Sequence, residues 1–454
     1  MSKNKTAQTR TAAQREQRTE VIASIATVLL FFGILVGFGL VTVFSEKESF
    51  SETQNRKLAD FPKISGKNIY SGKFTSGVED YISDHFAGHD RWIAAKTAAE
   101  LLSGKRERND IYILDDRLVE KIAEPDMDEV SKSAMGIKQF AEDNHILPYV
   151  MIVPTQAEIY KSELPANAPN PDQQAFINDV YSMLDGSAVP IDVYSVMSAN
   201  KDSYIYYRTD HHWTTQGAFL AYTAAAKKMD ITPLSVGDYD IDHASDSFKG
   251  TFYSKVLYEG IEPDSIDIWL PADREEEPEV EIYSTFGADP EIHEGMYFRE
   301  YLDVKDKYST FFGTNQPMIT IRTGNKGGRL LVFKDSYAHC FVPFMTEHFS
   351  EITMVDLRYI QMSYKDIIDV SDYDKVLFLY NASTFMSDRN LKKLMYYKLY
   401  TKNQLKTVQT IEPKLAYMDY AKIFCLQFYW FLVLLRLQMK LWGRSVFVDR
   451  LNIL

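Results

Sequence analysis

Two short stretches of the chain contain the residue types of a nucleophilic acyl-transfer or hydrolytic site. Asp210 and His212 lie in the stretch Tyr207–Thr214, and Ser336 follows an apolar run more than a hundred residues later. A serine hydroxyl becomes an effective nucleophile when a histidine takes its proton and a carboxylate orients that histidine. We therefore predict Ser336 as nucleophile, His212 as general base and Asp210 as the group that orients it. Residues two apart project to the same side of an extended segment, so His211 should point away from this site.

The residues around Ser336 predict a strand, a sharp turn and a helix. The apolar run Leu330–Phe333 breaks into Lys334, Asp335 and Ser336, and a helix-like stretch follows from Ala338 to His348. A serine at such a turn lies near the free N–H groups of a helix N-terminus, which suit a developing oxyanion.

The elements that must position these residues alternate between strands and helices. The apolar runs predict strands, and the helical spacing predicts helices between them. Strands are expected at 148–153, 189–193, 204–207, 352–356 and 375–380, and helices at 130–144, 172–184, 214–229 and 386–399. This alternation predicts a three-layer α/β fold with a mostly parallel sheet. Ligands bind at the carboxyl ends of strands in such sheets, and both stretches lie at predicted strand ends.

The rest of the chain divides into segments around this α/β domain, which we place at residues 128–410. Residues 45–127 should form a helical lead-in, and residues 231–322 a β-rich insertion between the two halves of the site. The many aromatic residues of the insertion suggest that it covers the cleft and binds sugar rings. The alternative is that they pack a small core of the insertion itself.

An apolar run near the N-terminus predicts a membrane anchor. Residues 21–44 carry no charge and are long enough to cross a ~30 Å hydrocarbon core. Basic residues dominate residues 1–20, whereas Glu46, Glu48 and Glu52 follow the run. The positive flank should remain cytoplasmic, which places the rest of the chain outside a bacterial cell membrane with a single-pass anchor. The alternative is a cleaved signal peptide.

Residues 411–454 form an apolar and basic tail. The apolar segment 423–435 is short for a membrane span and is followed by Arg436, Lys440, Arg444 and Arg450. A helix lying on the membrane and a second span with a cytoplasmic tail both remain open.

Composition excludes several classes of function. The net charge of −13 argues against a nucleic-acid partner, because phosphate binding needs a basic surface. The two cysteines, Cys340 and Cys425, cannot build a disulfide framework or a cysteine-based zinc site. We expect Cys340 to pack in the core, and we expect neither a metal ion nor a cofactor at the site.

The motifs resemble those of a known group of proteins. Asp-x-His-Trp-Thr at 210–214, followed by a strand and Asp-Ser-Tyr at 335–337, is similar to the SGNH-hydrolase-like polysaccharide O-acetyltransferases. That group includes the alginate acetylation proteins and the proteins named for their Asp-His-His-Trp motif. Residues 54–62, 153–160, 343–349 and 356–358 resemble further signature stretches of the family. One departure is Lys334, which stands where esterases of this type have glycine before the Asp-Ser pair.

The resemblance implies a fold, an activity and additional site residues. It implies an SGNH-like fold and transfer of an acyl group, most simply acetyl, to a cell-surface polysaccharide through an acyl-enzyme. It also implies a multi-pass membrane-bound O-acyltransferase as partner. Four residues are expected to contact the oxyanion or the substrate, namely Asn381, Tyr337, Gln156 and Arg358. For Asn381 the alternative is that its side chain caps the loop 382–384.

Three other functions remain open on the sequence. A carbohydrate O-acetylesterase would use the same acyl-enzyme and release the acyl group to water. A non-catalytic partner of a membrane acyltransferase could retain the three residues without using them. The DHH phosphoesterases, which bind divalent metal, share the Asp210-His211-His212 signature, but they need further carboxylates at strand ends. The strand that ends at Val153-Pro154-Thr155 has none.

Overall fold

A computed structural model of the protein describes residues 2–395 and divides them into two compact units. The first contains residues 2–51 and 56–92, and the second contains residues 52–55 and 93–395. The predicted tail 411–454 and the end of the helix predicted at 386–399 lie outside the described residues.

The first unit begins with a long helix, α1 (Ser2–Phe44). Its segment Arg18–Phe44 has the length and composition of a membrane-spanning helix or of a signal sequence, and none of it is buried. The unit also contains β1 (Phe50–Ser51), β2 (Arg56–Lys57), α2 (Gly66–Tyr70) and α3 (Lys73–Asp84), and the first turn of α4 (His89–Leu102). The buried carboxylate of Asp84 accepts hydrogen bonds from the Arg56 guanidinium, at 2.7 and 3.0 Å, and from the Ala59 backbone at 2.7 Å.

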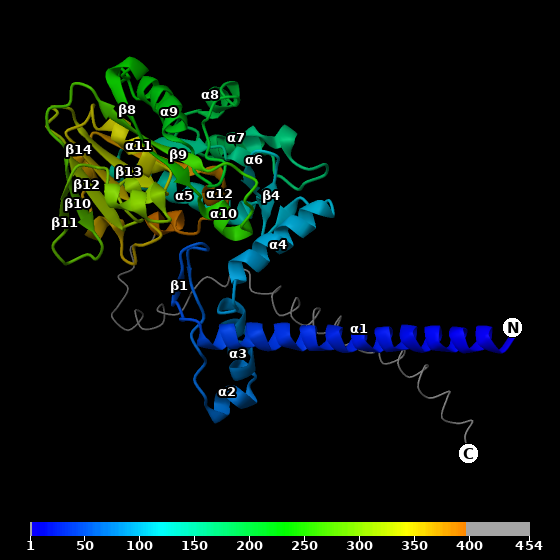
Figure 1. Ribbon diagram of the computed structural model, residues 1–454. Helices are drawn as coiled ribbons and strands as arrows, with labels where there is room; N and C mark the ends of the chain where they lie inside the picture. The colour runs from blue at the N-terminus through cyan, green and yellow to red at the C-terminus, as the bar shows by residue number, and fades with distance from the viewer. Residues whose placement is uncertain (1, 396–454) are drawn as a thin grey trace. The chain divides into compact units, whose positions relative to one another are not determined.

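The second unit is built on an eight-stranded sheet (Figure 1). The strands lie in the order β11 (Glu291–Glu294), β10 (Glu279–Tyr283), β12 (Met318–Arg322), β14 (Glu351–Val355), β13 (Arg329–Lys334), β15 (Lys375–Asn381), β6 (Tyr149–Val153) and β7 (Val189–Pro190). The five strands from β14 to β7 are parallel, and β12, β10 and β11 extend one edge in antiparallel pairings. The prediction of an α/β fold with a mostly parallel sheet is confirmed.

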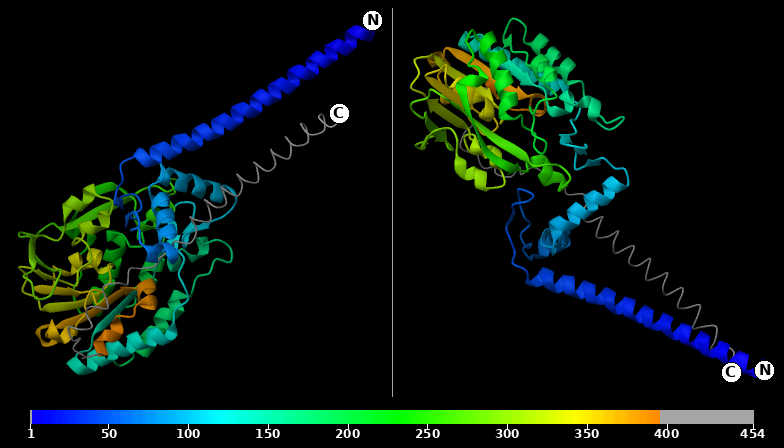
Figure 2. Two further views of the ribbon diagram at one scale, coloured as in Figure 1. Left: turned by 90° about the horizontal axis from the view of Figure 1, so that it is seen from below. Right: turned by 45° about the horizontal axis from the view of Figure 1, so that its top comes forward.

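Helices cover both faces of this sheet, because alternate strand residues are apolar on both sides. In β13, Leu330 and Val332 join one core cluster, whereas Leu331 and Phe333 join the other. The first cluster contains residues of α8 (Tyr194–Ala199), α9 (Thr215–Lys228) and α11 (Ala338–Met345). The second contains residues of α5 (Met127–Asn144), α7 (Gln173–Met183), α12 (Ala382–Ser387) and η7 (Leu391–Met395). The three layers are seen from two further directions in Figure 2.

Residues 231–322 are β-rich, as predicted, but they do not form a separate body. The strands β10, β11 and β12 belong to the main sheet, while β8 (Tyr239–Phe248) and β9 (Asp264–Pro271) pair as a two-stranded ribbon. Between β8 and β9 lies α10 (Thr251–Val256). The remaining short helices are α6 (Gln156–Ile159), η1 (Lys161–Glu163), η2 (Val236–Asp238), η3 (Arg299–Asp303), η4 (Lys307–Thr310), η5 (Tyr364–Asp366) and η6 (Val370–Asp372).

Three local expectations from the sequence differ from the structure. The lead-in is not all helical, because β3 (Glu107–Arg108), β4 (Ile111–Ile113) and β5 (Leu118–Glu120) form a three-stranded sheet. Residues 204–207 form no ladder, and a single bridge joins Tyr206 to Trp213. The helix predicted at 386–399 is replaced in the described residues by α12 and η7, since Asp388 adopts an extended conformation after Ser387.

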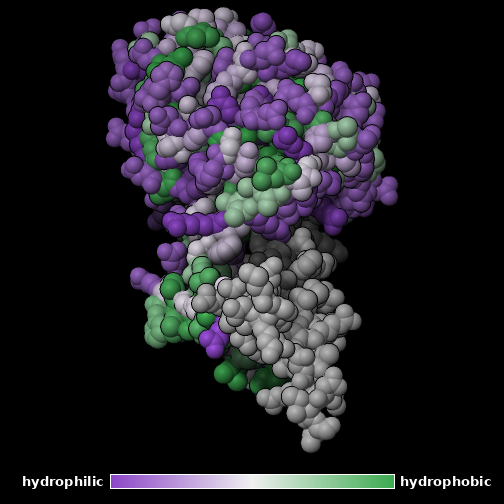
Figure 3. Space-filling view, turned by 45° about the vertical axis from the view of Figure 1, so that its right-hand side comes forward, coloured by the Kyte–Doolittle hydropathy of each residue, from purple (hydrophilic) through white to green (hydrophobic). Residues whose placement is uncertain are grey.

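The second unit has a predominantly hydrophilic outer face in the view of Figure 3, as expected for a surface in contact with water. Its core is apolar and dense in aromatic side chains, and among the fully buried large residues are Trp213, Tyr337 and Phe333. The residues of both predicted stretches are therefore held inside a packed scaffold.

Candidate active site

Asp210, His212 and Ser336 form one hydrogen-bonded chain. The His212 Nδ1 lies 2.6 Å from Asp210 Oδ1, and its Nε2 lies 2.7 Å from Ser336 Oγ. A carboxylate only accepts hydrogen bonds, so Nδ1 carries the hydrogen and Nε2 accepts from the serine hydroxyl. All three residues are at most 9% exposed. This is the arrangement in which a histidine can take a proton from serine while a carboxylate orients it.

Asp210 and His212 lie in a tight hairpin loop rather than in an extended strand. The loop is closed by hydrogen bonds from the Tyr207 N–H to the His212 carbonyl, at 3.2 Å, and from the Thr214 N–H to the Ile205 carbonyl, at 3.0 Å. Thr214 then begins α9, where its hydroxyl accepts from the Gly217 N–H at 3.2 Å. The loop and the helix are thus fixed together at Thr214.

Ser336 lies at the turn between β13 and α11, as the sequence predicts. The Trp213 indole N–H donates to the carbonyl of the next residue, Tyr337, at 3.1 Å, and ties the histidine loop to this turn. Among the described residues, nothing accepts a hydrogen bond from the Ser336 backbone N–H. That N–H is therefore available to an oxyanion forming at the serine.

The Asp210 carboxylate is held by four hydrogen bonds. Its Oδ1 accepts from the His212 ring and, at 3.0 Å, from the His212 backbone N–H. Its Oδ2 accepts from the backbone N–H and hydroxyl of Thr251, at 2.8 and 2.9 Å. Burial raises the pKa of Asp210, but His211, His212 and these hydrogen bonds outweigh burial and hold the pKa well below its ordinary value. The group therefore stays ionised.

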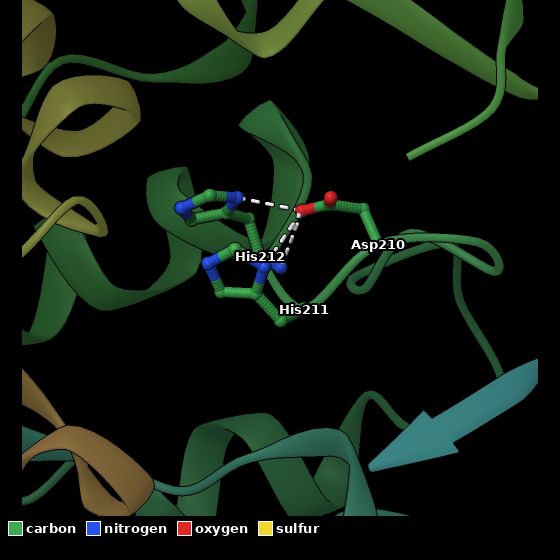
Figure 4. Close-up of side chains that lie close together, drawn as sticks. All are labelled: Asp210, His211 and His212. Atoms are coloured by element: carbon green, nitrogen blue, oxygen red, sulfur yellow. Dashed lines mark hydrogen bonds and ion pairs between the residues drawn. The ribbon is translucent and has the colours of Figure 1, made fainter. Parts of the chain in front are cut away.

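His211 lies on the same side as His212, so the prediction that it points to the opposite face is wrong. The two ring centroids are 3.7 Å apart, and His211 Nδ1 lies 3.4 Å from Asp210 Oδ1 (Figure 4). The prediction assumed an extended backbone, whereas the hairpin loop turns both side chains toward Asp210. Burial, followed by the neighbouring His212, lowers the pKa of His211 to about 4, so its ring is neutral near pH 7.

The insertion supplies two site residues that the sequence did not reveal. One is Thr251, which binds the Asp210 carboxylate. The other is Tyr308, whose ring stacks on His212 with centroids 3.6 Å apart and an angle of 8° between the planes. The Tyr308 hydroxyl also donates to the Ser336 carbonyl at 3.0 Å. Neither contact has a local sequence signal, because each residue reaches the site through long-range packing.

Asp335 fixes the turn that presents the serine. Its Oδ1 accepts from the Tyr337 N–H at 2.9 Å, and its Oδ2 accepts from the Asn381 backbone and amide N–H groups at 2.8 and 2.7 Å. The Asn381 amide also donates to the Thr384 hydroxyl at 2.8 Å and accepts from the Thr384 N–H at 2.9 Å. Both amide hydrogens are therefore in use, and the structure favours the cap over the oxyanion role predicted for Asn381.

A buried polar cluster lies beneath the turn, around Lys334. The ammonium group of Lys334 contacts His339 Nε2 at 2.6 Å, Asn315 Oδ1 at 3.2 Å and Asp356 Oδ2 at 3.6 Å. Burial lowers the pKa of Lys334 to about 8, and it also lowers the pKa of His339 well below its ordinary value. Lysine at the position where esterases have glycine is thus part of the support of the turn.

Arg358 belongs to this cluster and not to the group around Ser336. It pairs with both carboxylate oxygens of Asp356, at 2.9 and 2.6 Å. Arg358 does not line the cavity beside the three residues, so the structure gives its predicted substrate contact no support.

A cavity of about 280 Å³ adjoins the hydrogen-bonded chain. Its lining includes His211, which packs on His212, and Tyr337, which follows Ser336. Gln156 and Asn381 line it as well, so three of the four secondary residues predicted from the sequence meet at one cavity. They come from the carboxyl ends of adjacent strands β6 and β15 and from the turn after β13, which is where a parallel sheet places its ligands.

The donor atoms of Asp210, His211 and His212 lie within 4.8 Å of one another, which is close enough to share a metal ion. In the observed arrangement both ring nitrogens of His212 are engaged, one by Asp210 and one by Ser336. A metal ion bound through His212 would have to displace one of these hydrogen bonds. The two chemistries therefore compete for the same atoms.

Comparison with known proteins identifies relatives of the stretch that carries these residues. The family model described as "DHHW protein" matches residues 135–355. A "Probable alginate O-acetylase AlgJ" from Pseudomonas syringae pv. tomato is 21% identical over an alignment of 211 residues, and the match covers 43% of this chain and 50% of that protein. The chain thus spans about half the length of the curated relative that it matches.

Two solved structures share the fold. A DHHW family protein from Eubacterium siraeum is 25% identical with a TM-score of 0.55, and the match covers 64% of this chain and 97% of that one. Bacillus cereus PatB1 is 22% identical with a TM-score of 0.54, over 63% of this chain and 99% of that one. The resemblance found in the sequence is confirmed: residues 135–355, which include Asp210, His212 and Ser336, match the DHHW protein family, with distant homology to an alginate O-acetylase.

Proposed function

We propose that the protein is a serine-dependent O-acyltransferase that moves an acetyl group onto a cell-surface polysaccharide. The observation that carries this proposal is the position of His212, with Asp210 at 2.6 Å on one side and Ser336 at 2.7 Å on the other. The homology to an alginate O-acetylase favours an acetyl group and a polysaccharide acceptor, although it covers only half of that protein.

The first half-reaction forms an acyl-enzyme. The Ser336 Oγ attacks the carbonyl carbon of the donor ester while its proton passes to His212 Nε2. The free Ser336 N–H donates to the oxyanion, and Asp210 stabilises the imidazolium. When the tetrahedral intermediate collapses, the bond to the donor oxygen breaks and that oxygen takes the proton from His212 Nε2. The acetyl group then remains on Ser336.

The second half-reaction transfers the acetyl group to a sugar hydroxyl. The hydroxyl oxygen attacks the acyl carbonyl and gives its proton to His212 Nε2. The Ser336 Oγ leaves and takes that proton back, which restores the resting state. An esterase would differ only in that water attacks in this step, so exclusion of water from the site decides between the two outcomes.

The N-terminal helix supports a location at the outer face of the membrane. Residues 18–44 can anchor the chain, and the excess of basic residues before them favours a cytoplasmic N-terminus. The site would then lie outside, within reach of a multi-pass membrane-bound O-acyltransferase that delivers the acyl group across the bilayer. That partner and the polysaccharide belong to the proposal.

The test is a comparison of single and combined variants of the detergent-solubilised full-length protein. The wild type should hydrolyse an aryl acetate and pass acetyl to short glycans, and Ser336→Ala, His212→Ala and Asp210→Ala should each remove most of that activity. The losses should be non-additive, because the three residues act as a unit. Full activity in Ser336→Ala would refute the proposal. A wild-type protein that neither hydrolyses the aryl acetate nor transfers acetyl would instead be a non-catalytic partner of a membrane acyltransferase.

Two further measurements separate the remaining alternatives. Mass spectrometry of glycans incubated with protein and an acetyl donor should show acetyl gained, whereas acetyl only lost from esterified glycans would identify an esterase. A chelator should leave the activity intact. Activity lost on chelation and restored by Mn²⁺ or Zn²⁺ would instead assign Asp210, His211 and His212 to a metal.

A further inference from the structure

The cavity beside Ser336 has polar walls that the proposed chemistry does not use. Its volume of about 280 Å³ lies near the lower end of the range for small-molecule sites, roughly 300–1,000 Å³, which suits a single sugar ring rather than a long chain segment. Two aromatic residues, Phe252 and Tyr337, form apolar parts of the lining. The polar atoms decide which sugar fits.

Gln156, which lines this cavity, has an unpaired hydrogen-bond acceptor. The residue is 2% exposed, and its Nε2 donates to the Asp210 carbonyl at 2.7 Å. That bond fixes the orientation of the amide, because a flipped amide would set two oxygens against each other. The Oε1 atom is buried and has no partner among the described residues. A buried acceptor without a partner is costly, so a ligand that donates a hydrogen bond to it gains affinity.

His211 provides a second acceptor. The Thr251 hydroxyl has one hydrogen, which it donates to Asp210 Oδ2 at 2.9 Å. At its 3.0 Å contact with His211, the Thr251 oxygen must therefore accept from the Nδ1–H group. In the neutral ring the other nitrogen, Nε2, carries a lone pair, and no described residue donates to it.

The charges in the lining also favour a ligand that donates hydrogen bonds. Glu120 adds a carboxylate to the cavity wall. Lys255 is the basic residue of the lining, and its ammonium group lies 3.7 Å from Glu120 Oε1 with the side chain 45% exposed. This pairing offsets the charge of Lys255. The hydroxyl groups of the lining can donate or accept, so the carboxylate of Glu120 and the acceptors of Gln156 and His211 set the preference.

We propose that this cavity binds a sugar residue through its hydroxyl or ammonium groups and selects against uronic acids. A uronate carboxylate would face the oxygen of Gln156, the lone pair of His211 and the carboxylate of Glu120, and the ammonium group of the lining, on Lys255, already lies beside Glu120. The role of the bound sugar as acyl acceptor rests on the proposed function, whereas its binding in the cavity does not.

The experiment is equilibrium binding to the full-length protein in detergent, with no acyl donor present. Calorimetry would compare oligomers of equal length made of N-acetylglucosamine, glucosamine or galacturonate, which represent neutral, ammonium and carboxylate sugars. The N-acetylglucosamine oligomer, the glucosamine oligomer or both should bind at least ten times more tightly than the galacturonate oligomer. Gln156→Leu and His211→Phe should each weaken that binding about tenfold, the effect of one lost hydrogen bond to a buried group. Gln139→Leu on α5, outside the cavity, is the matched control.

Three results would overturn the inference. They are galacturonate binding equal to or tighter than that of the other two oligomers, full binding in both cavity variants, and no measurable binding of neutral or amino sugars. Because no donor is present, none of these results bears on Ser336, and a failure of Ser336 acylation would leave the binding result intact.

Discussion

Gly250 lies so close to Asp210 that a single added methyl group should disable the site. A Cβ atom at Gly250 would lie 2.3 Å from Asp210 Cβ and 2.5 Å from its Oδ2, whereas ordinary contacts begin at 3.4 Å. The Gly250 φ of −79° is open to alanine, so the cost comes from this contact and not from the backbone. Asp210 must therefore retreat by about 1 Å to reach ordinary contact distance.

The size of the effect follows from the hydrogen bonds of Asp210. A retreat of about 1 Å along the 2.6 Å contact with His212 would lengthen it beyond hydrogen-bonding distance. Misplacement of a catalytic group by this amount costs about 10²-fold, and loss of the orienting carboxylate about 10⁴-fold in serine enzymes. We expect kcat/KM of Gly250→Ala to fall by a factor between these values, and the free energy of unfolding to fall by about 1–3 kcal/mol.

The assay is aryl acetate hydrolysis by the full-length protein, together with denaturant unfolding of the same preparation. Gly237→Ala is the matched control, since the nearest atom to its added Cβ is the Ser235 hydroxyl oxygen at 3.8 Å. The control should behave as the wild type. A folded Gly250→Ala protein with wild-type kcat/KM would show that the position of Asp210 does not govern activity.

Three further predictions concern groups near the site. Because burial and His212 lower the pKa of His211 from 6.5 to about 4, the unfolded chain binds a proton in that pH range that the folded chain does not. The free energy of unfolding should therefore fall as pH drops from 6.5 to 4, and a wild-type slope retained in His211→Phe would contradict this. Burial raises the pKa of the Cys340 thiol to about 12, and the residue is only 1% exposed. Peptide mapping should therefore find Cys340 unlabelled by maleimide until denaturant is added. Trp213→Phe removes the donor to the buried Tyr337 carbonyl and should lower the denaturation free energy by about 1–3 kcal/mol, and an unchanged value would show that the bond is not needed.

The sequence predicted the sheet and the pairing partners of Ser336 better than it predicted their surroundings. Apolar runs such as Leu330–Phe333 fix buried strands, and the turn after them follows from the break in pattern. Asp210, His212 and Ser336 were predicted together because their residue types serve one chemistry and match a family motif, and the structure joins their side chains by hydrogen bonds. The orientation of His211 was missed because it depends on a hairpin loop, which alternation along a strand does not describe.

The remaining contacts depend on packing between distant segments. Thr251 and Tyr308 touch Asp210 and His212 only because the chain between β8 and β12 folds back on the histidine loop. Gln156 and Asn381 share a cavity because β6 and β15 are adjacent, a pairing that no local pattern specifies. The engagement of the Asn381 amide by Asp335 likewise appears only when both strands are in place.

The most direct test of Ser336 as the acylated nucleophile is to trap the acyl-enzyme. The full-length protein would be mixed with an aryl acetate, quenched in acid within the first turnovers and digested for peptide mass spectrometry. We predict one added acetyl group on Ser336, lost with time as water or a glycan takes it, and none on that peptide in Ser336→Ala. Acetyl found on another residue, or turnover with Ser336 never modified, would show that Ser336 is not the nucleophile.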